Sequence, residues 1–226
     1  MSLPEIVGRE RWRAAREELR RKERAVERAR AALAAERRRL PMAEVADAYV
    51  FEGGDGKATL LDLFGDRAQL VVHHFMFAPE QDTGCPCCAV LLDQIGPLAH
   101  LRARDTAFAA VSLAPFTRLL PFKARMGWTV PWYSSGESDF NRDFEATVDR
   151  DGTPVERPGL SCFLRHGDRI FHTYSVYDDA LDGIGALSGL LDLTALGPRP
   201  PGGDRLRLHD EYDEHDGHDG HDGHDH

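Results

Sequence analysis

The segment QLVVHHFMF (residues 69–77) is followed, after a seven-residue loop, by CPCC (residues 85–88), and this combination predicts the fold. The first segment is almost continuously apolar and rich in β-branched and aromatic residues, as in a strand that is covered on both faces. Pro86 stands where a first helical residue is expected, because proline is best tolerated at that position. The sequence therefore predicts a buried strand, a short loop and a helix that begins at the cysteines.

The residues after the cysteines extend this pattern. Residues 86–102 carry apolar side chains at helical spacing with a kink expected at Pro97, and residues 106–113 are predicted as a second buried strand. A helix at residues 115–126, interrupted at Pro121, follows.

The remaining residues of the domain complete an α/β pattern. A short extended aromatic segment is expected at residues 128–133, and a β-hairpin is expected around His166, Gly167 and Asp168. A last helix, capped by Asp178, would carry apolar side chains up to Leu191. The order predicts an α/β fold with a central mixed β-sheet flanked by helices.

The charge distribution divides the chain into three parts. The net charge is −10; residues 1–40 carry 13 Lys and Arg against 7 Asp and Glu, and residues 209–226 carry 8 Asp and Glu without Lys or Arg. These charges divide the chain into three segments that are expected to differ in structure: a basic arm, an acidic body and an acidic tail. We expect an N-terminal helical arm at residues 1–41, an α/β domain at residues 42–197, and a disordered linker with a His- and Asp-rich tail at residues 198–226.

The arm has the composition of a long helix, because residues 9–39 contain neither Gly nor Pro and are rich in Ala, Arg, Glu and Leu. Apolar side chains recur every seven residues, but the second position of a coiled-coil seam is weak, so the seam is narrow. The seam could cover its own domain or pack on a second subunit in a homodimer. Nucleic-acid binding is disfavoured because Glu alternates with Arg and aromatic residues are nearly absent. This heptad seam consists of Trp12, Leu19, Val26, Leu33 and Leu40.

The composition also bears on where in the cell the protein is expected to be found. No run of about 18 apolar residues exists, and the charged N-terminal residues lack the apolar region of a signal peptide. We therefore expect no membrane association and a cytoplasmic location, where thiols stay reduced unless they are redox-active. Four cysteines in 226 residues are too few for a disulfide scaffold.

The spacing of Cys85 and Cys88 indicates redox chemistry. Both sulfurs fall on one side of a first helical turn, with Cα atoms about 5–5.5 Å apart, which suits a disulfide. The helix dipole and backbone N–H groups stabilise a thiolate, so Cys85 is expected to be the nucleophile with a lowered pKa. Cys88, one turn further, would resolve the mixed disulfide. Cys87 is expected to point away from this pair, more as a small filler than as a third participant.

This chemistry is dithiol–disulfide exchange, with a protein or small-molecule disulfide or thiol as partner and no required cofactor. A zinc site usually needs four ligands in two separated pairs, and the only other cysteine is Cys162. A non-enzymatic copper- or zinc-binding protein, using the three clustered cysteines and the tail, stays open as an alternative.

Polar residues near the cysteines are candidates for an accessory role. His73 and His74 lie on the strand that leads to the loop, one on each face, as core histidines or as a proton relay. Of these we single out His74. Glu80 and Asp82 lie in the loop itself, where Glu80 could accept or relay a proton.

The tail repeats the triplet His-Asp-Gly and lacks core-forming residues, so we expect it to be disordered. Alternating imidazole and carboxylate groups suit Ni, Zn or Cu at low affinity. A purely solvating acidic tail is the alternative. The expected ligands are His215, His218, His221, His224 and His226.

Residues 49–77 (YVFEGGDGKATLLDLFGDRAQLVVHHFMF), followed by Cys-x-x-Cys, resemble the opening of thioredoxin-fold proteins of the peroxiredoxin and thiol-reductase branch. More closely, residues 1–197 resemble a bacterial thioredoxin-like family of unknown function whose members are described as predicted dithiol-disulfide oxidoreductases. The resemblance implies a thioredoxin-like fold and the redox class, but no substrate. It is carried by LPEIVGRERWRAAREELRRKE, RRRLPM, YVFEG, HHFMFAPE, GCPCC, MGWTVPWYSS, DFNRDF, PGLSCFLR and FHTYSVY.

Three comparisons with the wider superfamily bear on function. Thioredoxins carry Trp before the first cysteine, where this chain has Gly84. The superfamily usually has a cis-proline before a late strand, for which Pro158 is the candidate. Peroxiredoxins carry P-x-x-x-T-x-x-C, whereas Pro79, Thr83 and Cys85 are one residue short of it. A thiol peroxidase of peroxiredoxin type is therefore the alternative to dithiol–disulfide exchange.

Overall fold

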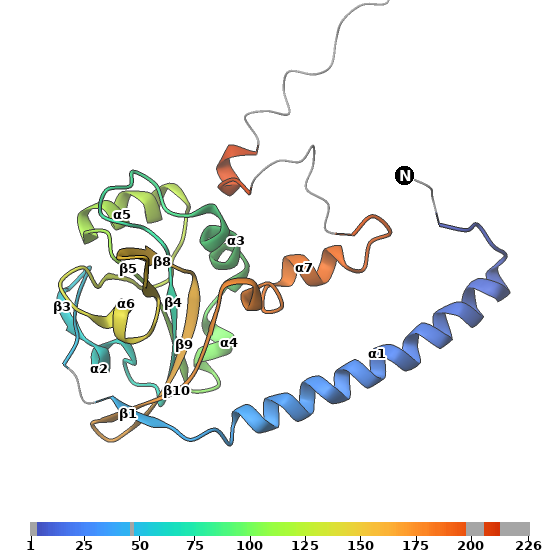
Figure 1. The fold of residues 1–226 in the computed structure, drawn as a ribbon, viewed down its shortest axis with the longest axis horizontal. Helices are drawn as coiled ribbons and strands as arrows, with labels where there is room; N and C mark the ends of the chain where they lie inside the picture. Colours follow the sequence, from blue (N-terminus) through green and yellow to red (C-terminus); the bar gives the residue numbers. More distant parts are fainter. Residues whose placement is uncertain (1–3, 46–47, 198–205, 213–226) are drawn as a thin grey trace, which may run out of the picture. The chain divides into compact units, whose positions relative to one another are not determined.

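The computed structural model describes residues 4–45, 48–197 and 206–212, and it divides into two compact units, Met1–Met42 and Ala43–His226 (Figure 1). Within these described residues, no helix is both long enough and apolar enough to cross a membrane.

The first unit is built around one helix, α1 (Arg9–Arg37). It begins after Gly8 and gives way to a turn before Pro41, as the composition predicts. Considered by itself, α1 has no buried residue, and the side chains of the heptad seam are 47–54% exposed. Whether the seam packs on the second unit or on another subunit stays a prediction.

Replacing Leu19→Asp together with Val26→Asp is expected to lower the free energy of unfolding by about 2–5 kcal/mol, because apolar burial is lost and charge is buried. Urea denaturation monitored by circular dichroism measures this. Ala14→Asp with Ala25→Asp adds the same charge away from the seam and should leave stability nearly unchanged. Equal stability of both double variants would show that nothing covers the seam.

The second unit contains an eight-stranded mixed sheet in the order β1-β10-β9-β4-β5-β6-β2-β3, which confirms the predicted architecture. At its centre, β4 pairs in parallel with β5 and antiparallel with β9, and β9 pairs antiparallel with β10. The strands are β1 (Ala43–Val45), β2 (Val50–Gly53), β3 (Gly56–Thr59), β4 (Gln69–His74), β5 (Thr106–Ser112), β6 (Trp132–Ser134), β9 (Gly159–His166) and β10 (Arg169–Tyr177).

The helices differ from the sequence-based expectation at two places. The helix α5 is continuous across Pro121, because the buried side chains of Leu119 and Phe122 hold it on the core. The expected last helix is broken into η1 and α7, since Gly183 and Gly185 interrupt it and glycine is a poor helix former. The helical segments of the second unit are α2 (Leu60–Leu63), α3 (Pro86–Ile95), α4 (Ala99–Arg102), α5 (Phe116–Arg125), α6 (Phe140–Asp143), η1 (Asp178–Leu181), α7 (Ala186–Leu191) and η3 (His209–Glu211).

Buried side chains cover both faces of the sheet. On one face, α3 and α5 pack over aromatic residues that include Phe75 and Trp132. On the other face, α2 and α6 pack over residues such as Val72 and Phe163. Because β4 is covered on both faces, every side chain of the strand after Gln69 is buried or half-buried, including those of His73 and His74.

A separate hairpin, β7 (Thr147–Arg150) and β8 (Thr153–Glu156), was not expected from the sequence. Its strands are short, and Pro154 lies within β8. Because proline is rare inside strands, a strand is usually not predicted at such a position. The hairpin matters because β8 ends at Glu156, close to the cysteines.

Candidate redox site

The cysteines lie where the loop after β4 enters α3. Cys85 is the N-cap of α3 and Pro86 its first residue, as predicted from the sequence. The backbone N–H of Cys85 donates to the carbonyl oxygen of Met76 at 3.0 Å, which ties the start of the helix to the end of the strand. A Cβ on Gly84 would lie 2.4 Å from the ring of Phe75, so this chain has no room for the tryptophan that thioredoxins carry there.

Three sulfur atoms gather at this helix start. The Sγ atoms of Cys85, Cys87 and Cys88 all lie within 4.8 Å of one another. Those of Cys85 and Cys87 are only 2.8 Å apart, and the backbone N–H of Met76 donates to the Cys88 sulfur at 3.4 Å. The expectation that Cys87 points away is wrong, because the N-cap residue lies outside the helical spiral and its side chain folds back over the first turn.

The three thiols differ in exposure and acidity. Cys85 is half-buried, Cys87 is exposed and Cys88 is buried. Hydrogen bonds from the thiol of Cys87, and to a smaller extent from that of Cys88, hold the pKa of Cys85 well below its ordinary value. Backbone N–H groups of the first turn lower it further, although the Cys85 side chain makes no capping hydrogen bond to the helix. The same interactions, together with burial, raise the pKa of Cys87 and of Cys88. One negative charge is thus concentrated on Cys85.

The two histidines of β4 face opposite sides of the sheet, as expected. His74, the candidate that we singled out, lies away from the cysteines, where it stacks on Phe140 and shares a 2.8 Å hydrogen bond with the Ser161 hydroxyl. His73 faces the cysteines and is completely buried, and burial lowers its pKa to about 4. The charge of Cys85 opposes this shift, which places His73 within electrostatic reach of that thiolate.

Glu156 is a candidate residue that the sequence did not reveal. It lines a cavity of about 510 Å³ together with Met76, Thr83 and Cys85, which we call the Cys85 cavity. Burial, followed by the charges of Glu80 and Cys85, raises the pKa of the Glu156 carboxyl to about 7. No local motif marks this residue, because the fold brings it from a hairpin some seventy positions away.

The other candidates are distributed as follows. Pro158 immediately precedes β9 and lines a cavity beside Cys88, but all peptide bonds of the described residues are trans. Glu80 is exposed in the loop before the cysteines, where it acts on Glu156 through its charge. Cys162 lies on β9, and burial raises its pKa. The predicted ligands of the tail, from His215 to His226, lie outside the described residues.

The fold and the site together define a thioredoxin-like α/β protein. A strand, β4, leads into a helix that starts at clustered cysteines; a parallel strand and then an antiparallel hairpin follow, in the sheet order β5-β4-β9-β10. The chain belongs to the family described as "Bacterial protein of unknown function (DUF899)", whose profile matches residues 1–212. This agrees with the family resemblance of the sequence.

Comparison with other proteins gives more distant likenesses. No curated protein matches the chain. Among solved structures, a cysteine-to-serine mutant of peroxiredoxin Q from Xanthomonas campestris is 17% identical, with a TM-score of 0.49 over 66% of this chain and 95% of its own. The peroxidoxin BcpB from Mycobacterium tuberculosis is 15% identical, with a TM-score of 0.43 over 59% and 85% of the two chains. A hypothetical protein from Sinorhizobium meliloti is 16% identical, with a TM-score of 0.44 over 76% and 81%.

Proposed function

We propose that the protein is a thiol–disulfide oxidoreductase in which Cys85 attacks and Cys88 resolves. The observation that carries this proposal is that the clustered thiols differ in burial and in acidity. A half-buried Cys85 has its pKa lowered by neighbouring thiols, while the buried Cys88 keeps its proton. A nucleophilic thiolate beside a protonated thiol is what the two steps of disulfide exchange require.

In the first step, the Cys85 thiolate attacks one sulfur of a substrate disulfide. The substrate S–S bond breaks, a mixed disulfide forms on Cys85, and one substrate thiolate leaves and takes up a proton. In the second step, Cys88 loses its proton and attacks the Cys85 sulfur, which releases the second substrate thiol. The substrate gains two electrons, the protein is left with a disulfide, and a dithiol reductant regenerates it.

Cys87 competes for the resolving role, since its sulfur lies 2.8 Å from that of Cys85. We favour Cys88 because it is buried, whereas Cys87 is exposed and more accessible to other thiols and disulfides. Reacting the reduced protein with excess oxidised glutathione and mapping the product by peptide mass spectrometry tests the proposal. A Cys85–Cys88 disulfide is expected; a Cys85–Cys87 disulfide would transfer the resolving role, and unreacted thiols would overturn the function. Consumption of hydrogen peroxide instead of disulfides would favour the thiol peroxidase.

Glu156 is proposed as the proton donor to the departing substrate thiolate, because it shares the Cys85 cavity and its pKa is raised to about 7. The rate of disulfide reduction should therefore carry an inflection near pH 7, where the donor is lost on ionisation. Glu156→Gln should remove this inflection. Glu80→Gln should keep it but move it to lower pH, since the charge of Glu80 raises the pKa of Glu156. Stopped-flow kinetics between pH 5.5 and 9 measures this, and an unchanged profile in Glu156→Gln would reject the role.

A second candidate function is the binding of a soft metal ion. Three thiols whose sulfurs lie within 4.8 Å of one another could converge on Cu(I) or Zn(II) as thiolates. Binding would have to displace the protons of Cys87 and Cys88, whose pKa values are raised, so affinity should increase with pH.

Removing residues 213–226 distinguishes this metal site from the tail, and it keeps Leu208, whose side chain is buried in the core. The removed segment holds five histidines, so the truncated protein should lose nickel and zinc binding. Binding by the full chain should weaken as pH falls below about 6.5, because neutral imidazole is the ligand. Disulfide reduction should be nearly unchanged. Calorimetric titration with each metal measures this, and a truncated protein that keeps its metal would identify the cysteines as the site.

A further inference from the structure

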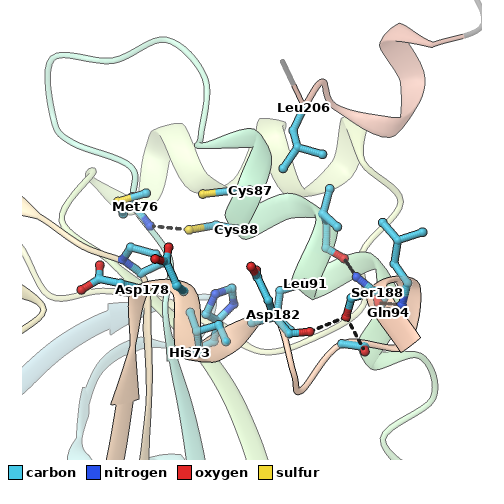
Figure 2. A pocket seen from close by; sticks show the side chains of 16 residues that line it. His73, Met76, Cys87, Cys88, Leu91, Gln94, Asp178, Asp182, Ser188 and Leu206 are labelled. Atoms are coloured by element: carbon cyan, nitrogen blue, oxygen red, sulfur yellow. Dashed lines mark hydrogen bonds between the residues drawn. The ribbon is translucent and has the colours of Figure 1, made fainter. Parts of the chain in front are cut away.

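A second cavity lies beside the cysteines, on the α3 face of the sheet (Figure 2). This α3 cavity has a volume of about 400 Å³, in the range of small-molecule sites. Cys87 and Cys88 form one end of it. Both cavities reach the sulfur cluster, this one at Cys87 and Cys88 and the Cys85 cavity at Cys85, and Met76 lines both. Most of the wall is apolar and comes from Leu91, Leu181, Leu187 and Leu206.

His73 is a buried polar residue of the cavity wall. Its side chain is 0% exposed, and neither ring nitrogen has a hydrogen-bond partner among the described residues. Figure 2 shows its ring on the same side of the cavity as the sulfurs of Cys87 and Cys88. Neutral imidazole offers one donor and one acceptor, and leaving both unsatisfied in a buried site is costly. A polar ligand atom at that depth would relieve the cost.

Part of the cavity wall is acidic. Asp178, Asp179 and Asp182 line it, and the described lining residues include no Lys or Arg. Asp178 is paired with Arg157 at 3.5 Å. For Asp179 and Asp182, no ion pair joins either carboxylate to a described residue, and both are exposed at the cavity rim. A ligand that carries a cationic group would meet uncompensated negative charge there.

We infer that the α3 cavity binds the organic part of a small amine-bearing disulfide. This inference rests on the proposed function, because it gives the class of substrate for the same cysteines. The substrate sulfurs would lie at the cysteine end, the carbon chain along the leucines, and the ammonium group between Asp179 and Asp182. Cys85 would attack as described above, with two electrons passing to the substrate and a dithiol restoring the protein.

Three small disulfides that differ in charge test the inference: cystamine, which is cationic, 2-hydroxyethyl disulfide, which is neutral, and dithiodipropionate, which is anionic. Each rate is divided by the rate of the same disulfide with dithiothreitol, to remove intrinsic reactivity. Cystamine should be preferred over the neutral disulfide, and Asp179→Asn with Asp182→Asn should reduce this preference about 3- to 10-fold. Asp55→Asn with Asp168→Asn, which removes equal charge from exposed positions outside the cavity, should leave it unchanged.

A redox-silent ligand separates this inference from the proposed function. 1,6-Diaminohexane has the length and charges of cystamine without sulfur, and its binding can be followed by calorimetry. It should bind to the unaltered protein and to the Asp55/Asp168 control, and lose affinity in the Asp179/Asp182 variant. Such binding without any disulfide reduction would overturn the redox function but keep the cavity. Reduction without a charge preference, or with one that both double variants change equally, would overturn the cavity's role.

Discussion

Replacing Cys85 with serine is expected to lower the rate of disulfide reduction by more than about a thousandfold, because a hydroxyl is not ionised at neutral pH and cannot replace the thiolate. The neighbouring thiols and first-turn N–H groups stabilise negative charge at this position, whereas the net effect of the surroundings is to raise the pKa of Cys87 and of Cys88. Reduction of a small disulfide, coupled to excess dithiothreitol, measures the loss. An activity within tenfold of the unaltered protein would show that another thiol attacks.

The two remaining cysteines provide the matched variants. Cys88→Ser should accumulate a stable mixed disulfide on Cys85, visible as the added mass of one substrate half, because the resolving step is blocked. Cys87→Ser should still turn over, and its hydroxyl can still donate a hydrogen bond to Cys85. Cys87→Ala removes the donor and should raise the pKa of Cys85, since the thiol of Cys87 is the largest contribution to its lowering. If Cys87→Ser traps substrate and Cys88→Ser does not, the resolving roles are exchanged.

The free energy of unfolding is expected to fall steeply as pH drops from 6.5 towards 4. Burial lowers the pKa of His73 to about 4 and that of His74 to about 3, against an ordinary value of 6.5. Folding therefore favours neutral histidines, so their contribution is complete above pH 6.5 and is lost as the unfolded chain takes up protons below it. Each histidine should cost about 3 kcal/mol by pH 4. Glu156 acts in the opposite direction, because its raised pKa favours the folded state as pH falls below 7, but one carboxyl does not offset two histidines.

Urea denaturation at several pH values between 7.5 and 4 measures this loss. His74→Gln removes one of the two groups and can still hydrogen-bond to Ser161, so its stability should depend less on pH over the same range. His100→Gln is the control, since His100 lies in α4 outside the buried core and its replacement should keep the full pH dependence. Equal slopes in the two variants would contradict the assignment of acid sensitivity to β4.

Local signals in the sequence were sufficient for the elements around the cysteines. The apolar run at residues 69–77 predicted β4, and proline after Cys85 predicted the start of α3, because both effects depend on neighbours along the chain. Pro97 predicted a kink, and the chain shows a full break between α3 and α4. The prediction of one continuous last helix was wrong. Its apolar residues recur at helical spacing, but the two glycines within it lower the local preference for a helix.

The sequence by itself thus determined the α/β class, the long α1 helix and the position of the thiols at a helix start, since hydrophobic period, propensity and proline geometry are local properties. Only the tertiary structure decided which groups surround those thiols. The folded-back contact of Cys87 with Cys85 depends on side-chain direction at the N-cap. Which of the two histidines lies near the thiols, His73 and not His74, depends on which face of β4 packs against α3. Glu156 reaches the Cys85 cavity from a distant hairpin, and its raised pKa comes from burial, which no local pattern encodes.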